Sequence, residues 1–328
     1  MNTSARKPTL GLLLGDPTGI GPELVAKLLA APDTSARANI LLIGDSRLYR
    51  QGASIAQVSE MSVDLLEYSG VSDGYPAARV SAAAGEYALG SLRLALENLR
   101  RGAIDAVVYA PLNKQAMKLA GMKHEDELHY FASLLDYHGT VSEINVCGGL
   151  WTSRVTSHVP LREVPDLITA DKIYAAANLL HGALVAGGIP APRIAIAALN
   201  PHAGEGGLLG SEEITTIIPA VERARAQGLH LTGPLPADTL FIAARRGDYD
   251  GVVTMYHDQG QIALKLLGFE RGVTVSGGLP LPITTPAHGT AFDIAGKGVA
   301  DVRALQEAFT IASRMAVANK QEVHHAKA

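Results

Sequence analysis

Three histidines stand directly after apolar segments that are far apart in the chain. His158 lies in "VTSHVPLRE", His202 in "LNPHAGEGG" and His257 in "MYHDQG". Neutral imidazole is the commonest protein ligand of Zn, Co, Ni and Fe, and the neighbouring carboxylate of Asp258 could orient a ring or join the coordination shell. A lone histidine is more often a hydrogen-bonded structural residue, and no HExxH spacing is present. The shared position after apolar runs leaves a metal site and three structural histidines as about equally good interpretations.

Two glycine-rich segments could hold a ligand through their backbone. "GDPTGIGPE" (Gly15–Glu23) lacks the GxGxxG dinucleotide fingerprint. Its glycines permit a tight turn close to a ligand, and a plain strand-to-helix turn is the alternative. "HGTAFDIAGKG" (His288–Gly298) combines a histidine, glycines and Asp293. Backbone amides in such a loop could hold an adenine or ribose edge, whereas an unspecialised loop would have no such role.

These segments must be positioned by regular elements. Short apolar runs alternate with longer amphipathic segments, which is typical of an α/β protein with a largely parallel sheet. Ligands of such sheets bind beyond the carboxyl ends of the strands, where the polar clusters fall. Pro22 suits a first helical turn, and Ser211 with two glutamates suits a capped helix start. The predicted strands are Thr9–Leu14, Ile40–Ile43, Ala106–Tyr109, Arg193–Leu199 and Gly251–Met255, and the predicted helices include Pro22–Ala30, Gly90–Arg101, Ala170–Ala186, Ser211–Gln227 and Val302–Ala318.

Composition narrows the class of protein. The chain has 328 residues, 47% of them hydrophobic and 18% charged, which suits one large or two medium globular domains. A net charge of −4 without basic runs predicts neither a nucleic-acid partner nor a membrane surface. Cys147 is the only cysteine, so no intramolecular disulfide forms. With no signal-peptide pattern and no run of membrane-spanning length, we expect a cytoplasmic protein.

No linker interrupts the composition, so the sequence does not mark a domain boundary. The expected arrangement is discontinuous, with the two chain ends forming one domain and the middle forming another. We predict that residues 1–125 and 275–328 form one domain and that residues 126–274 form the other.

The quoted segments, together with "APLNK", "SHVPLREV" and "GPLPADTLF", resemble the PdxA family, whose namesake is 4-hydroxythreonine-4-phosphate dehydrogenase of vitamin B6 (pyridoxal phosphate) biosynthesis. The resemblance runs from about residue 10 to residue 301, and its motifs are specific in combination. It implies a three-layer α/β/α fold of the isocitrate and isopropylmalate dehydrogenase type, with two domains and the active site in the cleft. It also implies a homodimer with a shared active site.

The resemblance further implies cofactors and site residues. A divalent metal (Zn, Mg, Co, Mn, Ni or Fe) would be bound by His158, His202 and His257, in a domain that also serves substrate binding and dimerisation. NAD or NADP would accept hydride in the discontinuous nucleotide-binding domain. The implied cofactor-binding residues are Gly15, Asp16, His288, Gly289 and Asp293.

Three further residues would assist the chemistry. Asp238 and Asp258 match family positions beside the metal and could take part in ligation or proton transfer. Lys265 matches a substrate-binding lysine of the family and could pair with an anionic group or act as an acid. A plain surface lysine is the alternative for Lys265. Lys114 in "PLNK" is a weaker candidate of the same kind.

The chain departs from the family where the namesake binds phosphate. An ungapped match places Glu127 and Leu128 at the His and Thr of a Gly-His-Thr element. A carboxylate repels a phosphate dianion, and leucine makes no hydrogen bond to it. Two further substrate-binding positions hold Thr274 and Ile283, in place of Asn and Arg, and the lost Arg removes a charge-assisted contact. A small gap would instead bring His124 or His129 into the pocket.

The sequence therefore favours a divergent member of the family. The preferred substrate is a hydroxy acid or a cis-dihydrodiol carboxylate of the terephthalate type, oxidised at a secondary alcohol with decarboxylation. Leu279, Leu281 and Ile283 could form an apolar wall for its ring. The alternative is 4-hydroxythreonine-4-phosphate or a related phosphorylated sugar acid. A catalytically silent ligand-binding protein is the third hypothesis.

Overall fold

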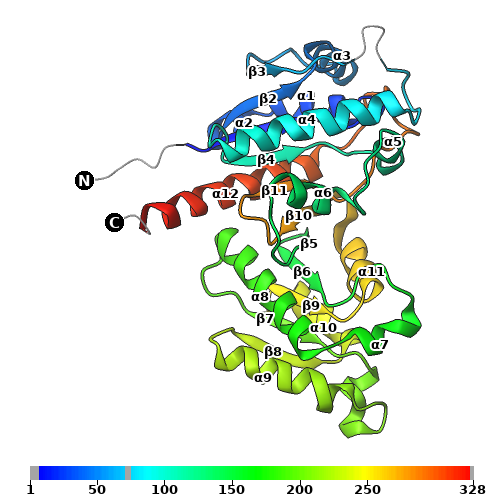
Figure 1. The fold of residues 1–328 in the computed structure, drawn as a ribbon, viewed down its shortest axis with the longest axis vertical. Coiled ribbons are helices and arrows are strands. Elements are labelled where there is room, and N and C mark those ends of the chain that lie inside the picture. Colours follow the sequence, from blue (N-terminus) through cyan, green and yellow to red (C-terminus); the bar gives the residue numbers. More distant parts are fainter. Residues whose placement is uncertain (1–6, 71–74, 326–328) are drawn as a thin grey trace. The chain divides into compact units, whose positions relative to one another are not determined.

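The computed structural model describes residues 7–70 and 75–325, which divide into two compact units (Figure 1). Unit 1 is built from both ends of the chain, Met1–Gly139 and Val273–Ala328, and unit 2 is Thr140–Gly272. The predicted boundary at residue 125 placed helix α6 in the second domain. The structure groups α6 with unit 1, because Tyr130 and Phe131 of this helix are buried in the core of unit 1.

The described part of unit 1 has strands in the order β3-β2-β1-β4-β11-β10. The pairs are parallel except for β10 and β11, which are antiparallel. Helix α4 contacts α5 and α6, α12 contacts α1 and α2, and both α4 and α12 contact β4. The elements are β1 (Thr9–Leu13), α1 (Gly21–Ala30), α2 (Pro32–Arg37), β2 (Asn39–Gly44), α3 (Ser46–Ala56), β3 (Asp64–Glu67), α4 (Ala82–Arg100), β4 (Ala106–Tyr109), α5 (Lys114–Leu119), α6 (Glu127–Leu134), β10 (Val273–Gly277), β11 (Ile283–Pro286) and α12 (Arg303–His325).

Helix α4 supplies much of the core of unit 1. Its N-cap is Ser81, whose side chain accepts a hydrogen bond from the backbone N–H of Ala84. Leu92, Leu96 and Leu99 recur at helical spacing and are buried against the sheet. The helix therefore begins eight residues before the predicted start at Gly90. Gly85 in its first turns allows close packing, because a Cβ there would lie 2.0 Å from the carbonyl oxygen of Ala116 on α5.

The described strands of unit 2 follow the order β5-β6-β9-β7-β8. β5 and β6 are antiparallel, and the other pairs are parallel. The elements are β5 (Ser142–Cys147), β6 (Leu150–Arg154), η1 (Leu161–Glu163), α7 (Val164–Leu167), α8 (Ala170–Ala186), β7 (Ile194–Ala197), η2 (Pro201–Gly207), η3 (Glu213–Ile217), α9 (Ile218–Ala226), β8 (Leu231–Leu235), α10 (Ala237–Arg245), β9 (Gly251–Thr254), α11 (His257–Gly268) and η4 (Phe269–Arg271).

The α/β class and the largely parallel pairing are confirmed, and so are the bounds of β4 and α8. The single helix predicted from Ser211 to Gln227 is instead a π-helical turn, η3, followed by α9. Pro219 lies in the first turn of α9 and has no N–H to donate to the turn before it, so a regular α-helix cannot run through. Over the described ranges, no helix is long and apolar enough to cross a membrane.

Candidate active site

Two of the three sequence-predicted histidines lie side by side in unit 2. His158 follows β6 and His257 begins α11 directly after β9, and these two strands are parallel neighbours. The backbone N–H of Thr156 donates to the carbonyl of Met255 at 3.1 Å, so the two chain segments stay together beyond the sheet. The ring centroids of His158 and His257 are 5.4 Å apart. Two imidazoles at this separation can present nitrogens to one ion.

Asp258 orients one of these rings. Its Oδ1 lies 2.6 Å from Nδ1 of His257, on the adjacent residue. A carboxylate that accepts from Nδ1–H leaves Nε2 as the lone-pair nitrogen, which is the arrangement of a metal-binding histidine. His257 is half-buried and His158 is exposed, so solvent reaches the pair.

His202 lies in an unusual turn that follows β7. Residues 202–206 all have positive φ, so that η2 winds with left-handed backbone geometry. His202, Ala203 and Glu205 adopt this conformation although they are not glycines, and each such residue costs roughly 1–2 kcal/mol. Within residues 7–70 and 75–325, no group of three His, Cys, Asp or Glu side chains is arranged to hold a metal. The donor chemistry of the His158–His257 pair fits a divalent ion, while His202 as third ligand stays a prediction.

A buried carboxylate fixes the start of this turn. Glu213 is 1% exposed, and its Oε1 accepts from the backbone N–H groups of Leu199 and Asn200 at 2.8 and 2.7 Å. Its Oε2 accepts from the side-chain amide of Asn200 at 2.9 Å. The sequence suggested that Glu213 supports a helix start through its charge. The structure shows that it points inward and organises the strand end that precedes His202.

Gln259, one of the polar residues after β9, makes hydrogen bonds to the protein backbone. Its Oε1 accepts from the backbone N–H of Met255, and its Nε2 donates to the carbonyl of Ala198, both at 2.7 Å. Because Ala198 directly follows β7, this side chain ties together the ends of two neighbouring strands. Gln259 is thus structural, and His257 and Asp258 are the members of the cluster left for a ligand.

The other two residues proposed for chemistry in unit 2 are exposed. Asp238 lies in the first turn of α10, and Lys265 lies near the end of α11. Lys265 and His257 share α11 but are separated by about 12 Å along its axis at 1.5 Å per residue. The helix alone therefore does not bring Lys265 to the histidine pair.

In unit 1 the region that departs from the family forms a compact charged cluster. Oε2 of Glu127 lies 3.5 Å from Nζ of Lys114, and the Glu127 side chain is 12% exposed against 55% for Lys114. Leu128 is buried. Solvent therefore reaches the lysine ammonium more readily than the glutamate carboxylate.

A second carboxylate supports the same cluster. Asp126 caps α6 by accepting from the backbone N–H of His129 at 2.9 Å, and it lies 2.7 Å from Nδ1 of the same histidine. Burial raises the pKa of Asp126, but the two contacts with His129 and the charges of His129 and Lys114 outweigh burial and hold the pKa below its ordinary value. His124 lies beside Tyr130, and its Nδ1 is buried with no partner among the described residues.

The two remaining substrate-binding positions differ in accessibility. Thr274 lies on β10 and is half-buried. Ile283 lies on β11, exposes none of its surface and belongs to the core of unit 1. Leu279 and Leu281 pack against the same core. Ile283, on the strand next to β10, therefore exposes no surface to a substrate in this structure, whereas Leu279 and Leu281 are half-buried. A substrate-facing apolar wall stays a prediction for the two leucines.

The glycine-rich turn and the loop 288–298 lie together in unit 1. The backbone N–H of Ile20 donates to the carbonyl of Thr290 at 3.1 Å. Gly15 has φ +74°, and a Cβ there would lie 2.5 Å from the carbonyl oxygen of Ala110.

The loop 288–298 offers accessible surface. Gly289 and Asp293 are exposed, and the space around Gly289 is open. His288 is half-buried, with Nδ1 3.1 Å from the carbonyl of Gly289.

Asp16 faces its own turn. It is 1% exposed, and its Oδ1 accepts from the backbone N–H and the hydroxyl of Thr18 at 2.7 and 2.6 Å. Burial raises the pKa of Asp16, and the hydrogen bonds from Thr18 oppose the rise without cancelling it. In this structure Asp16 shapes the turn and presents almost no surface to a cofactor.

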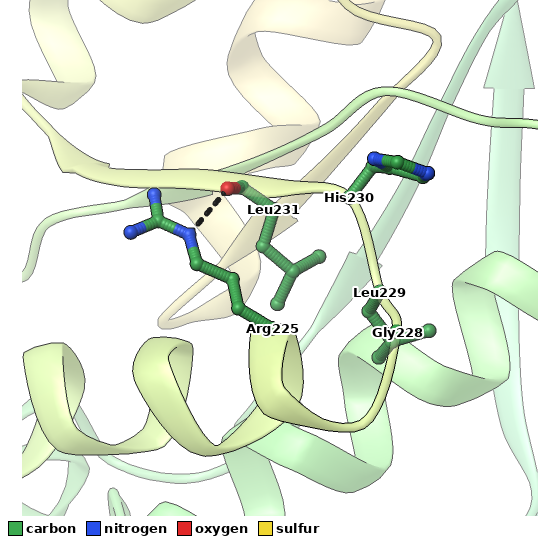
Figure 2. Close-up of a pocket in the computed structure, with 5 residues that line it drawn as sticks. All are labelled: Arg225, Gly228, Leu229, His230 and Leu231. Atoms are coloured by element: carbon green, nitrogen blue, oxygen red, sulfur yellow. Dashed lines mark hydrogen bonds between the residues drawn. The ribbon is translucent and has the colours of Figure 1, made fainter.

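A surface hollow of about 310 Å³ lies elsewhere, at the turn between α9 and β8 (Figure 2). It is lined by Arg225, Gly228, Leu229, His230 and Leu231. Nε of Arg225 donates to the carbonyl of Leu231 at 2.8 Å. In Figure 2 the Arg225 side chain and the His230 ring lie on opposite sides of the backbone rather than facing each other. The hollow contains none of the sequence-predicted site residues.

Sequence reasoning missed several residues that organise these sites. Glu23 and Lys27, four residues apart on α1, form a largely buried ion pair at 2.7 Å. Their i,i+4 spacing, directly after the glycine-rich turn, is a signal that could have identified them.

The family model and two similar relatives of this chain point to the same family. The family described as "Pyridoxal phosphate biosynthetic protein PdxA" matches residues 32–312. A relative from Pseudomonas aeruginosa, provisionally named 4-hydroxythreonine-4-phosphate dehydrogenase 2, is 50% identical and covers 94% of this chain and 97% of its own. A D-threonate 4-phosphate dehydrogenase from Cupriavidus necator is 40% identical, with the same two coverages.

Solved structures agree with this relationship. The 4-hydroxythreonine-4-phosphate dehydrogenase of Klebsiella pneumoniae has a TM-score of 0.83 at 35% identity and covers 96% of this chain and 99% of its own. A terephthalate 1,2-cis-dihydrodiol dehydrogenase from Burkholderia xenovorans has a TM-score of 0.67 at 31% identity, with coverages of 92% and 96%. Similarity is thus higher to the enzymes named for phosphorylated substrates.

Proposed function

This chain belongs to the PdxA family, and we propose that it is an NAD(P)-dependent dehydrogenase that oxidises the secondary alcohol of a phosphorylated hydroxy acid. The observation that carries the proposal is near-full-length similarity to relatives named for 4-hydroxythreonine 4-phosphate and D-threonate 4-phosphate. The dihydrodiol substrate favoured from sequence has weaker support, since the dihydrodiol dehydrogenase is less similar in both sequence and structure.

The Lys114–Glu127 pair removes the main argument against a phosphorylated substrate. That argument assumed that Glu127 would face the phosphate with an uncompensated negative charge. In the structure its carboxylate is largely shielded and lies 3.5 Å from the Lys114 ammonium. An oriented lysine at the accessible side of such a pair is a suitable phosphate contact. We assign this role to Lys114.

The residues of unit 2 would act on the reacting alcohol. We propose that His158 and His257 bind a divalent metal, with Asp258 holding the tautomer of His257. When bound, such an ion polarises a hydroxyl oxygen and lowers its pKa. Lys265 remains the proposed substrate contact of unit 2, and Asp238 a proposed proton-transfer group.

The dinucleotide is assigned to unit 1. The exposed backbone at Gly289 and the tight turn at Gly15 favour close approach of a ligand to the main chain. Of the five predicted cofactor residues, His288, Gly289 and Asp293 carry accessible surface, so they are the stronger candidates. Gly15 and Asp16 would act by shaping the turn.

A homodimer is part of the proposal. Unit 2 exposes several large apolar side chains, as a subunit interface would require. Sedimentation velocity should report twice the mass of the 34.3 kDa chain. The exposed residues are Leu161, Leu208, Leu209, Ile214, Ile218, Ile242, Ile262 and Leu266.

The substrate comparison is the decisive test. Purified protein with divalent metal and NAD or NADP is assayed for reduced nicotinamide with three substrates, which are 4-hydroxythreonine 4-phosphate, D-threonate 4-phosphate and a terephthalate cis-dihydrodiol. We expect kcat/KM for the better phosphorylated substrate to exceed that for the dihydrodiol by at least about a hundredfold. Equal or reversed values would refute the phosphate assignment. Binding of these ligands without turnover would favour the silent ligand-binding protein. Release of CO₂ in the same assay tests decarboxylation.

A further inference from the structure

A buried ion pair on α1 contacts the far end of the loop that begins at His288. Oε1 of Glu23 accepts from Nζ of Lys27 at 2.7 Å and from the backbone N–H of Ala300 at 2.8 Å. Nζ of Lys27 also donates to the carbonyls of Gly298 and Ala300, at 3.0 and 2.8 Å. These four contacts are here called the α1 clamp, and three of them join α1 to residues more than 270 positions further along the chain.

The α1 clamp leaves its loop little freedom. At the other end of the loop, the backbone N–H of Ile20 holds the carbonyl of Thr290. Gly298 has φ +74°, and a Cβ there would lie 2.6 Å from the carbonyl oxygen of Ile55. The segment between residues 290 and 298 is therefore held at both ends by the chain that follows β1.

The α1 clamp carries an energetic cost, because one of its carboxylate oxygens is buried without a hydrogen-bond partner among the described residues. The Glu23 residue is 2% exposed, and its Oε2 is buried without a hydrogen-bond partner among the described residues. An unpaired buried oxygen of this kind opposes folding. A neutral apolar pair could fill the same space, but it could not hold the N–H of residue 300 and two carbonyls at once.

We infer that Glu23 and Lys27 are positioning residues for the dinucleotide, acting through the loop 288–300 and not by touching the cofactor. This inference rests on the proposed function, because the loop carries His288, Gly289 and Asp293, the accessible candidates for cofactor binding. Binding of a dinucleotide to backbone groups requires a preorganised loop, since ordering a mobile one at each binding event weakens affinity.

The test compares wild type with Glu23→Gln, Lys27→Met and the conservative Lys27→Arg. We expect Glu23→Gln and Lys27→Met to raise Kd and KM for the dinucleotide by about tenfold. The KM for the phosphorylated substrate should stay within about twofold. Lys27→Arg keeps the charge and the donors, so it should restore most of the lost affinity. The matched control is Asp171→Asn, a carboxylate-to-amide change in an exposed ion pair with Arg223, which should change nothing.

Hydrogen exchange separates this inference from the proposed function. Amides of residues 288–300 should exchange faster in Glu23→Gln than in wild type, whether or not a dinucleotide binds. Unchanged exchange, or unchanged dinucleotide affinity in folded variants with altered exchange, would overturn the positioning role. Failure of the wild type to bind any dinucleotide would instead overturn the proposed function. Lys27→Met keeps the test valid if Glu23→Gln does not fold.

Discussion

Nζ of Lys114 lies 3.5 Å from Oε2 of Glu127, and the lysine is the more exposed member of the pair. The two residues begin α5 and α6, so the pair also joins the starts of two short helices. This relationship changes the meaning of Glu127, which from sequence alone looked like a barrier to phosphate.

Replacing Lys114 by Met should weaken binding of the phosphorylated substrate. The change removes the accessible ammonium and leaves Glu127 without this partner, so we expect KM to rise by about tenfold or more with a smaller effect on kcat. Steady-state kinetics with the better phosphorylated substrate measures the effect. Lys172→Met, at an exposed lysine in the first turn of α8 in unit 2, is the control and should behave as wild type. An unchanged KM in Lys114→Met would remove Lys114 from the phosphate site.

Removing either histidine of the pair should release bound metal. His257→Ala and His158→Ala each delete one imidazole donor, and the remaining donor cannot hold a divalent ion at micromolar concentration. Elemental analysis after dialysis measures the stoichiometry. Asp258→Asn should retain the ion but weaken its affinity by about 10- to 100-fold. His181→Ala, a change of the same kind on α8, is the control. Full metal content in His257→Ala would disprove the ligand assignment.

Glu213→Gln should destabilise unit 2. The amide would place an N–H₂ group where Oε2 now accepts from the side chain of Asn200, so that two donors face each other in a buried position. We expect the free energy of unfolding to fall by about 2 kcal/mol in urea titrations. Glu212→Gln changes a more exposed neighbour that also contacts Asn200. In this variant the free energy of unfolding should fall by less than about 0.5 kcal/mol. Equal losses in the two variants would contradict the special role of Glu213.

Asp16→Asn should stabilise the protein at neutral pH. The folded-state pKa of Asp16 is raised above the ordinary value of 3.8, so the folded protein binds this proton more tightly than the unfolded chain. Its contribution to stability is therefore fully favourable at low pH and is lost as pH rises through the folded-state pKa. Asparagine keeps the acceptor for Thr18 and does not titrate.

The comparison of Asp16→Asn with wild type must be made across pH. We expect a gain on the order of 1 kcal/mol at pH 7. The gain should shrink to near zero as pH falls to the ordinary carboxyl range. A gain that is independent of pH would show that the charge of Asp16 is not its cause.

Clear local patterns in the sequence made some elements predictable. β4 is an uninterrupted buried run, and α8 has a Thr169 cap that accepts from the N–H of Lys172. The start of α4 was missed because Gly85 and Gly90 weaken helix propensity. The structure explains Gly85 by close contact with α5, a tertiary constraint that no local pattern contains.

Site residues were predictable where strand ends bring them together. The rule that ligands bind at the carboxyl ends of strands selected His158, His202 and His257 from the sequence. His158 and His257 follow neighbouring strands and have ring centroids 5.4 Å apart, and the role of all three histidines as metal ligands stays a prediction. The inward turn of Glu213 could not be predicted, because a glutamate near a helix start is ordinarily a surface charge. The left-handed conformation at His202 and Ala203 was equally hidden, since neither residue type favours positive φ.

The way the chain builds unit 1 has a consequence for its synthesis. β4 pairs with β11, and α12 packs on both strands, yet β11 and α12 come from the last part of the chain. During translation all of unit 2 leaves the ribosome before unit 1 can be completed. One side of β4 then lacks its final partner while nascent chains are crowded together, and an open strand edge invites pairing between molecules. The nascent chain should therefore depend on chaperones until residues 283–325 have emerged.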